Sequence, residues 1–348
     1  MANGFANQVG GINFDFNTVP DLQPKNIRGI IKLQSLPEEN VLRDAIKTVP
    51  VADMLFKARI DDAINLDMTP EVGMTADDPM VGDNWRWKTD QVNSYRQACK
   101  ISVEIGRQLL APEGDPRKYA GQSELNRLIN RVTVAVDNRR EYNRAMGISN
   151  AHDYDPIRKS DLVSNNVISV VESNKKFDST EKDAKGYLIC EPFNLISACA
   201  NRLGFISGKM PTDLIVTPDV MTALENVNAT NRTNELTPPK KKGARYTCRN
   251  LQVFVSQGRK NVGTNDNPVI KPLFENQLII CSLDADTIAE NQYDINRVEQ
   301  FTTADRLFYY VRFWHKSRVH VSRPINFFYV KDVLANPYEF NNVDSLIS

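Results

Sequence analysis

The sequence predicts an α+β fold, and three parts of the chain carry that prediction. In residues 193–227, apolar residues recur at helical spacing, then form a short strand-like run, then recur at helical spacing again. Residues 115–147 carry a second and much longer helical pattern. Residues 307–314 and 318–330 are rich in β-branched and aromatic side chains, which is typical of strands. Separate helical and β-rich segments of this kind indicate the α+β class.

The segment 193–227 is expected to form a helix, a strand and a second helix. Gly204 follows the first apolar pattern and is predicted to end that helix in the left-handed conformation. Leu214, Ile215 and Val216 form a run typical of a buried strand. Thr217 then predicts the cap of the next helix, because Pro follows at the first helical position. None of these turns carries a catalytic group, so the unit is interpreted as a scaffold.

The longest predicted helix begins at Asp115 and Pro116 and ends near Gly147. A helix of ~31 residues would be ~46 Å long, which suits a structural spine. Its apolar stripe is expected to comprise Leu125, Leu128, Ile129, Val132, Val136, Tyr142 and Met146. Its polar side is expected to carry Arg127, Asn130, Arg131, Asn138, Arg139, Arg140, Glu141 and Arg144. The arginines could meet acidic residues of a neighbouring molecule, which we favour, or DNA.

Residues 57–90 predict a long two-stranded loop with a polar tip. Short alternating stretches flank a tip rich in Pro, Gly and Asp. Loops beyond ~12–15 residues without their own core are uncommon inside a compact domain, and an isolated hairpin is marginally stable in water. The loop is therefore expected to rest on a neighbouring copy of the chain. Trp85 and Trp87 are the expected anchors at that contact; the alternative is a stacking platform for bases.

Composition limits the classes of partner and compartment. Lys plus Arg and Asp plus Glu are 43 each, and this balance argues against a protein that mainly wraps nucleic acid. It also favours self-association, because copies do not repel one another. The five scattered cysteines, with no CxxC pair, indicate reduced thiols made in a cytoplasm. No signal-peptide pattern opens the chain, and no apolar run approaches the ~18 residues of a membrane span.

The sequence contains no recognised catalytic or phosphate-binding motif. GxxxxGK[ST], GxGxxG, HExxH and GxSxG are all missing. His152, His315 and His320 are interpreted as ordinary surface or interface residues. Two Asp-x-Asp sequences, at 153–155 and 284–286, could hold magnesium but are better explained as solvated loops. We therefore predict a protein that is not an enzyme and has no cofactor or metal.

The order of the parts resembles the major capsid protein of tailed double-stranded DNA bacteriophages, the Hong Kong ninety-seven fold. These parts are an N-terminal arm, a long extended loop, a spine helix, an α/β unit and terminal strands. The resemblance is closest in residues 166–171, 193–208, 210–220 and Leu224, followed by a strand pair at 251–255 and 278–281. It covers nearly the whole chain in order, although its motifs are degenerate.

The resemblance implies a division of the chain into five parts. Residues 1–50 would be the N-terminal arm and 51–100 the extended loop, called the E-loop. Residues 101–190 would be a peripheral domain with the spine helix at about 115–147. Residues 191–285 would be an α/β axial domain, and 286–348 would be terminal strands that return to the peripheral domain. No long acidic helical extension precedes the arm, which points to a separate scaffold protein or to earlier trimming.

The function implied by the resemblance is structural. Copies would assemble into pentamers and hexamers of an icosahedral or prolate head that encloses double-stranded DNA. Expected partners are other copies, a portal, a scaffold protein, decoration proteins and non-specifically packaged DNA, with no membrane. The protein would be made in the host cytoplasm and reside in the virion. The residues expected at subunit interfaces are Trp85, Trp87, Lys88, Arg131, Arg139, Arg140, Lys240, Lys241 and Lys242.

Two other functions stay open at the level of sequence. An encapsulin-like compartment would use a similar fold to hold a protein cargo. A monomeric α+β ligand-binding protein or enzyme would belong to another class. For the lysine run at 240–242, contact with phosphate is the alternative to an exposed loop tip.

Overall fold

A computed structural model describes residues 14–61, 85–151, 169–240, 244–264, 267, 269–293, 297–302 and 308–337. Its α-helices are α1 (Pro24–Leu33), α2 (Val103–Leu109), α3 (Pro116–Ser149), α5 (Pro192–Ser207) and α6 (Pro218–Thr230). Short 3-10 turns occupy Phe16–Thr18, Pro20–Leu22, Val41–Arg43 and Pro324–Asn326. Among the described residues no helix has the length and apolar character that a membrane span requires.

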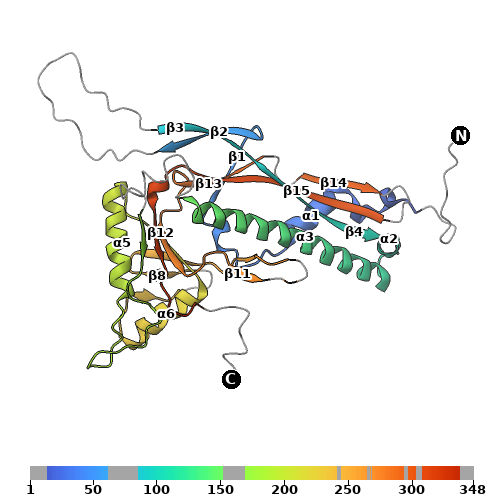
Figure 1. Ribbon diagram of the computed structural model, residues 1–348. Coiled ribbons are helices and arrows are strands. Elements are labelled where there is room, and N and C mark those ends of the chain that lie inside the picture. The colour runs from blue at the N-terminus through green and yellow to red at the C-terminus, as the bar shows by residue number, and fades with distance from the viewer. Residues whose placement is uncertain are drawn as a thin grey trace, which may run out of the picture.

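The first large sheet has five strands and is organised around β15. Its strands are β1 (Lys47–Pro50), β4 (Asn93–Ser102), β13 (Ile288–Gln292), β14 (Arg297–Thr302) and β15 (Phe308–Val321). β15 pairs antiparallel with β4 over ten residues, and also pairs antiparallel with β13 and β14. Figure 1 shows α3 running alongside β4 and β15, so the predicted spine helix lies against this sheet.

The second large sheet has seven strands in the order β5-β16-β12-β6-β9-β8-β7. These are β5 (Ser169–Glu172), β16 (Phe327–Lys331), β12 (Gln277–Cys281), β6 (Asp213–Val216), β9 (Leu251–Val255), β8 (Tyr246–Cys248) and β7 (Leu236–Thr237). The predicted strand at 214–216 and the strand pair near 251–255 and 277–281 are confirmed. The helix predicted after Thr217 is also confirmed, and Thr217 is its N-cap.

Three clusters of buried apolar residues hold these layers together. One lies where α5 and α6 cover one face of the seven-stranded sheet, and includes Leu214 and Val216. Ile215, between those two residues, belongs to a second cluster on the opposite face, as strand alternation requires. That second cluster also contains Ile148 of α3 and Val321 of β15, so it joins the two sheets. The third cluster packs the first half of α3 against β4 and β15.

Two helices, α5 and α3, extend beyond the glycines at which they were predicted to end. α5 continues through Gly204 and ends at Gly208, which has the left-handed φ of 70°. α3 continues through Gly147 to Ser149 and has 34 residues, about 51 Å. A Cβ at Gly147 would lie 2.5 Å from Val319 Cγ1, and one at Gly204 would lie about as close to Met210 Sδ. Both glycines therefore permit close packing inside an element rather than ending it.

One expectation about β structure is also corrected, and the N-terminal part contains regular structure. The β-rich segments predicted at 307–314 and 318–330 are not separate strands, because β15 runs straight through residues 315–317 while paired with other strands. Residues 14–50 contain α1 and β1, and Leu22 and Ile27 are buried against the body of the same chain; their assignment to an N-terminal arm stays a prediction. The proposed domain limits stay a prediction, but β16 belongs to the seven-stranded sheet rather than to the sheet under α3.

Candidate interaction surfaces

The two-stranded loop predicted from the sequence is present as a hairpin separate from both large sheets (Figure 1). β2 (Leu55–Asp61) pairs antiparallel with β3 (Trp85–Gln91), from Leu55 opposite Gln91 to Asp61 opposite Trp85. The predicted anchors Trp85 and Trp87, and Lys88, lie in β3. The tip between the strands, 62–84, lies outside the described residues. Among the described strands, β2 and β3 pair only with each other.

The base of this hairpin is attached to the far end of β15. The ring of Phe56 packs edge-on against the ring of His320, with centroids 6.4 Å apart. Arg318 Nε lies 3.3 Å from Asp90 Oδ2. Leu55, at the start of β2, is 63% exposed. These contacts fix the direction of the hairpin where it leaves the body.

The arginines of α3 divide into two groups that the sequence could not separate. Arg131 and Arg139 are exposed, as expected of a surface that meets a partner. The Arg139 guanidinium is held over the rings of Tyr95 and Tyr142, at 4.5 and 4.7 Å from their centroids. Such a cation–π arrangement orients the guanidinium before any partner arrives.

Arg140 has a different environment, in which groups of the same chain pair with its guanidinium. Its Nη2 lies 2.8 Å from Glu290 Oε2 and donates to Thr48 Oγ1 at 3.2 Å. Glu290 is fully buried, so the Arg140 guanidinium is committed to the interior. Of the lysine run, Lys240 is exposed, and Lys241 and Lys242 lie outside the described residues.

Arg140 belongs to a buried polar cluster that sequence reasoning missed. Arg144 donates to Glu290 Oε2 at 2.6 Å, and His315 Nε2 lies 3.4 Å from Glu290 Oε1. Arg144 and Glu141 are both 1% exposed, although both were expected on the polar side of the helix. Glu290 lies in β13, 146 residues from Arg144, so no local pattern could reveal the pair.

The carboxylates of this cluster have strongly shifted pKa values. Burial alone would raise the pKa of Glu290, but hydrogen bonds from His315 and Arg140 and the charge of Arg144 hold it well below its usual range. For Glu141, burial raises the pKa to about 7, although the Leu42 amide donates to it at 2.9 Å. Glu290 is thus the buried anion that the cluster stabilises.

The described residues present no arrangement that suggests catalysis. Burial raises the pKa of Cys99 and Cys199 to about 11 and that of Cys248 to about 12, so these thiols are poor nucleophiles. Among the described residues, no group of three His, Cys, Asp or Glu side chains could hold a metal ion. Asp284 accepts from the Thr287 amide and pairs with Lys209, which explains it as a turn residue. His152 and the sequence at 153–155 lie outside the described residues.

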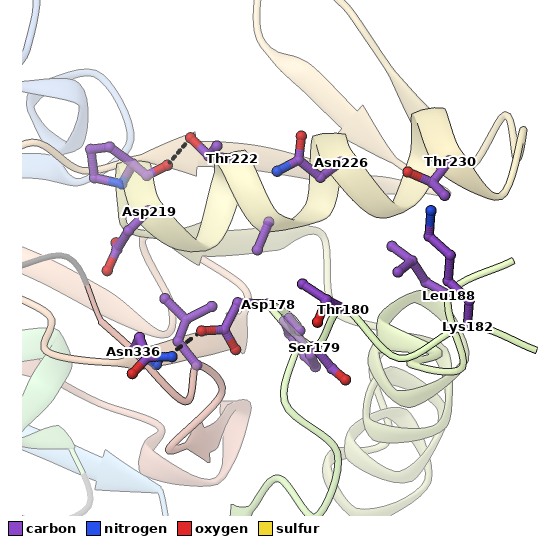
Figure 2. Close-up of a pocket in the computed structure, with 14 residues that line it drawn as sticks. Asp178, Ser179, Thr180, Lys182, Leu188, Asp219, Thr222, Asn226, Thr230 and Asn336 are labelled. Atoms are coloured by element: carbon purple, nitrogen blue, oxygen red, sulfur yellow. Dashed lines mark hydrogen bonds between the residues drawn. The ribbon is translucent and has the colours of Figure 1, made fainter. Parts of the chain in front are cut away.

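A groove lies beside α6 on the described surface. It has a volume of about 970 Å³ and lies between α6 and residues 177–188 (Figure 2). From α6 it is lined by Thr222, Ala223 and Asn226, among others. The Asp178 carboxylate lies at one end and accepts from the backbone amides of Ala335 and Asn336 at 2.8 and 2.9 Å.

The sequence matches no protein-family model and no curated protein. Solved structures, however, share the architecture. A phage-related protein from Bordetella bronchiseptica RB50 aligns over 89% of this chain and 97% of its own, with 10% identity and a TM-score of 0.58. A candidate capsid protein of a prophage in Escherichia coli CFT073 aligns over 89% and 99%, with 13% identity and a TM-score of 0.53. An encapsulin complex from Synechococcus elongatus PCC 7942 aligns over 86% and 89%, with 10% identity and a TM-score of 0.50.

At these identities the comparisons establish the fold. The two alignments cover 89% of this chain and 97% and 99% of the two phage-related chains. The chain therefore has the phage capsid protein fold, in the Hong Kong ninety-seven form that the sequence resemblance predicted.

Proposed function

We propose that this chain is a major capsid protein, which assembles into the pentamers and hexamers of a viral head enclosing double-stranded DNA. The observation that carries the proposal is the fold itself. This chain aligns over 89% of its length with a phage-related protein and with a candidate prophage capsid protein, at TM-scores of 0.58 and 0.53. The role is structural rather than catalytic.

Surface chemistry supports assembly from many copies. Leu33 is 85% and Phe205 78% exposed, so two large apolar side chains gain nothing from the fold of the single subunit. The net charge of zero limits repulsion between copies. Each subunit would make several weak contacts at once, and such multivalency stabilises a closed shell strongly.

The proposed interface residues lie in the hairpin, on α3 and in the loop at 240–242. The hairpin would contact a neighbouring subunit through Trp85, Trp87 and Lys88. Arg131 and Arg139 would meet acidic groups of a neighbour from the exposed side of α3. For the lysines at 240–242, we propose contact with a neighbour at the loop tip. The internal bonds of Arg140 leave its guanidinium less suited to such a role.

Within the virion, the subunit would need partners of other kinds. We propose a portal and a separate scaffold protein, with decoration proteins outside and non-specifically bound DNA inside. The axial part of the chain would make the central contacts of each capsomer.

The main rival is an encapsulin-like shell, which the likeness to the Synechococcus elongatus complex favours. The deciding experiment is purification of particles from cells that express the chain in its native genomic setting. Nuclease-protected double-stranded DNA inside the particles would support a viral head. Particles that contain one co-purifying enzyme and no DNA would support the encapsulin-like alternative.

Size-exclusion chromatography and negative-stain electron microscopy test assembly itself. We expect rings or closed shells at some combination of salt, pH and protein concentration. A single sharp peak near the 39.4 kDa subunit mass under all assembly conditions would instead support the monomeric alternative.

A further inference from the structure

The five-stranded sheet packs one face against α3, and its other face is only partly covered. Along β15, the buried side chains of Val311 and Phe313 belong to the apolar cluster that includes α3. Strand alternation directs Arg312, Trp314 and Lys316 to the opposite face. All three residues are half-buried there, so this face of β15 is accessible to a partner.

Basic side chains collect on this second face from two neighbouring strands. Residues directly opposite each other in paired strands share a face of the sheet. Arg96 of β4 lies opposite Trp314, and Lys100 of β4 lies opposite Tyr310. Phe301 of β14 faces Tyr310 from the other side and is 38% exposed. We call this surface the basic sheet face; it comprises Arg96, Lys100, Phe301, Tyr310, Arg312, Trp314 and Lys316.

Most of the positive charge of the basic sheet face is not neutralised by nearby carboxylates. Arg312 Nη1 lies 3.8 Å from Glu299 Oε2, which belongs to β14 on the same face. Among the described residues, this is the single salt bridge that the four basic side chains make. Like charges gathered on one face repel each other, and an anionic partner would offset that repulsion.

Aromatic rings hold the basic side chains in position. The Lys100 ammonium lies 3.4 Å from the centroid of the Phe308 ring. The Arg312 guanidinium lies 4.7 Å from the ring centroid of Phe301 and 5.8 Å from that of Trp314. Such cation–π contacts orient the charges before a partner arrives.

The four positive charges form a regular zigzag row. They come at the levels of residues 310, 312, 314 and 316 of β15, alternately from β4 and from β15 itself. Two residues of a strand rise about 6.7 Å, so the row spans about 20 Å. An extended polypeptide presents alternate side chains at the same interval. Carboxylates at alternate positions of such a segment would therefore meet successive charges of the row.

These features favour a protein segment over nucleic acid as the occupant. Single-stranded nucleic acid binds through bases that stack on free aromatic faces. Here the rings of Phe301 and Tyr310 stack on each other, with centroids 5.2 Å apart, and two cations lie over Trp314. Duplex binding rests on neutralising many phosphates, and the net charge of this chain is zero.

We propose that the basic sheet face binds an extended segment of a partner protein that carries acidic side chains at alternate positions. The segment lies along β15, and its carboxylates pair in turn with Lys100, Arg312, Arg96 and Lys316. The proposal concerns a surface of the single subunit, so its failure would leave the proposed capsid function untouched.

Fluorescence anisotropy with the dispersed full-length chain tests this assignment. The probe is a labelled peptide of about ten residues in which Glu and Thr alternate, long enough to span the row. Its neutral counterpart has Gln in place of Glu. At low ionic strength, where exposed charges are least screened, we expect the Glu peptide to bind at least tenfold more tightly than the Gln peptide. Equal binding of the two peptides, or tighter binding of a duplex DNA of the same length, would overturn the proposal.

Variants that remove charge locate the site. Arg96→Gln combined with Lys100→Gln removes two charges of the row, and we expect the Glu peptide to bind at least fivefold more weakly. The matched control combines Lys25→Gln with Arg28→Gln, which removes two exposed charges from α1 and should change the affinity less than twofold.

Lys316→Gln is an independent variant on β15, for which we expect at least a twofold loss of affinity for the Glu peptide. Urea midpoints show whether each variant is folded. Equal weakening in R96Q/K100Q and in K25Q/R28Q, or full affinity in both R96Q/K100Q and K316Q, would contradict the proposal.

Discussion

Glu290 is the residue on which the contact between the spine helix and the five-stranded sheet depends most. Its carboxylate is fully buried and receives Arg140 and Arg144 from α3 and His315 from β15. Removing a carboxylate from water is costly, and the cost is offset only when the partners are close and well oriented. The two arginines meet this condition, since they approach to 2.8 and 2.6 Å.

Replacing Arg144 with Met should therefore destabilise the subunit strongly. The change leaves a buried carboxylate with one arginine instead of two, and we expect a loss of about 3 kcal/mol in the free energy of unfolding. Arg127→Met is the matched control, because Arg127 lies on the same helix in an exposed pair with Glu124. Urea unfolding of the dispersed subunit should show no change for this control. Equal effects of the two substitutions would contradict the role given to the cluster.

Glu141 should make stability depend on pH in the opposite sense to a normal salt-bridged carboxylate. Its pKa in the folded chain, about 7, lies above the ordinary value of 4.5. The folded state therefore binds the proton more tightly, and stability falls as pH rises from about 4.5 to 7, then levels off. The full change would be about 3 kcal/mol. Glu141→Gln keeps an oxygen to accept from the Leu42 amide but cannot ionise.

Urea midpoints measured from pH 4.5 to 8 check this prediction. The decline should be present in the unaltered chain and lost in Glu141→Gln. Glu290 does not confuse the result, because its lowered pKa removes stability only as the pH falls below about 4.5. A decline that persists unchanged in Glu141→Gln would show that another group titrates in this range.

At the scale of elements, the spine helix lies closer to β15 than a side chain at Gly147 would allow. Gly147→Ala gains up to about 1 kcal/mol of helix propensity, yet its Cβ would meet Val319 at 2.5 Å. We expect the clash to dominate, with a net loss of about 1–2 kcal/mol in thermal or urea unfolding. Gly29→Ala in α1 is the control, because no atom lies within 4 Å of its new Cβ. That control should be neutral or stabilising; the opposite order would refute the packing argument.

Helix starts could be predicted from the sequence, whereas the helix ends predicted at glycines could not. Asp115 and Pro116, or Thr217 and Pro218, begin helices through contacts within one turn, so those starts are confirmed. A glycine that permits close packing has the same sequence pattern as one that ends a helix, and only the partner distinguishes them. The partner of Gly147 lies 172 residues away, in β15.

Burial of charge was unpredictable for a related reason. Glu141 and Arg144 occupy positions that a helical wheel assigns to solvent, but on that side of α3 the Leu42 amide meets Glu141, and Glu290 of β13 meets Arg144. The hairpin was predictable, because its strands alternate and a polar tip separates them. Which of the helix arginines stay exposed was not, since Arg139 and Arg140 differ only in what the rest of the fold places beside them.

At the scale of the whole molecule, the subunit buries three apolar clusters and leaves other apolar side chains exposed to solvent. The hairpin pairs with no other strand of the described chain, and large apolar residues such as Leu33 remain exposed. A chain that folds stably with such surface can be dispersed at low concentration and still associate when copies are abundant. Folding and assembly should then be separable by mutation.

The three tryptophans allow that separation to be tested. Replacing both Trp85 and Trp87 in β3 with Ala should leave the subunit folded, because among the described strands β3 pairs with β2 alone and belongs to neither large sheet, and should reduce particle yield at least tenfold. Trp314→Ala is the contrasting variant: Trp314 lies in β15 beside Arg312 and Lys316, so its loss should lower subunit stability. Circular dichroism and urea midpoints report folding, and negative-stain microscopy reports particles. An unfolded W85A/W87A subunit, or a normal yield of shells from it, would show that the hairpin does not anchor one subunit to the next.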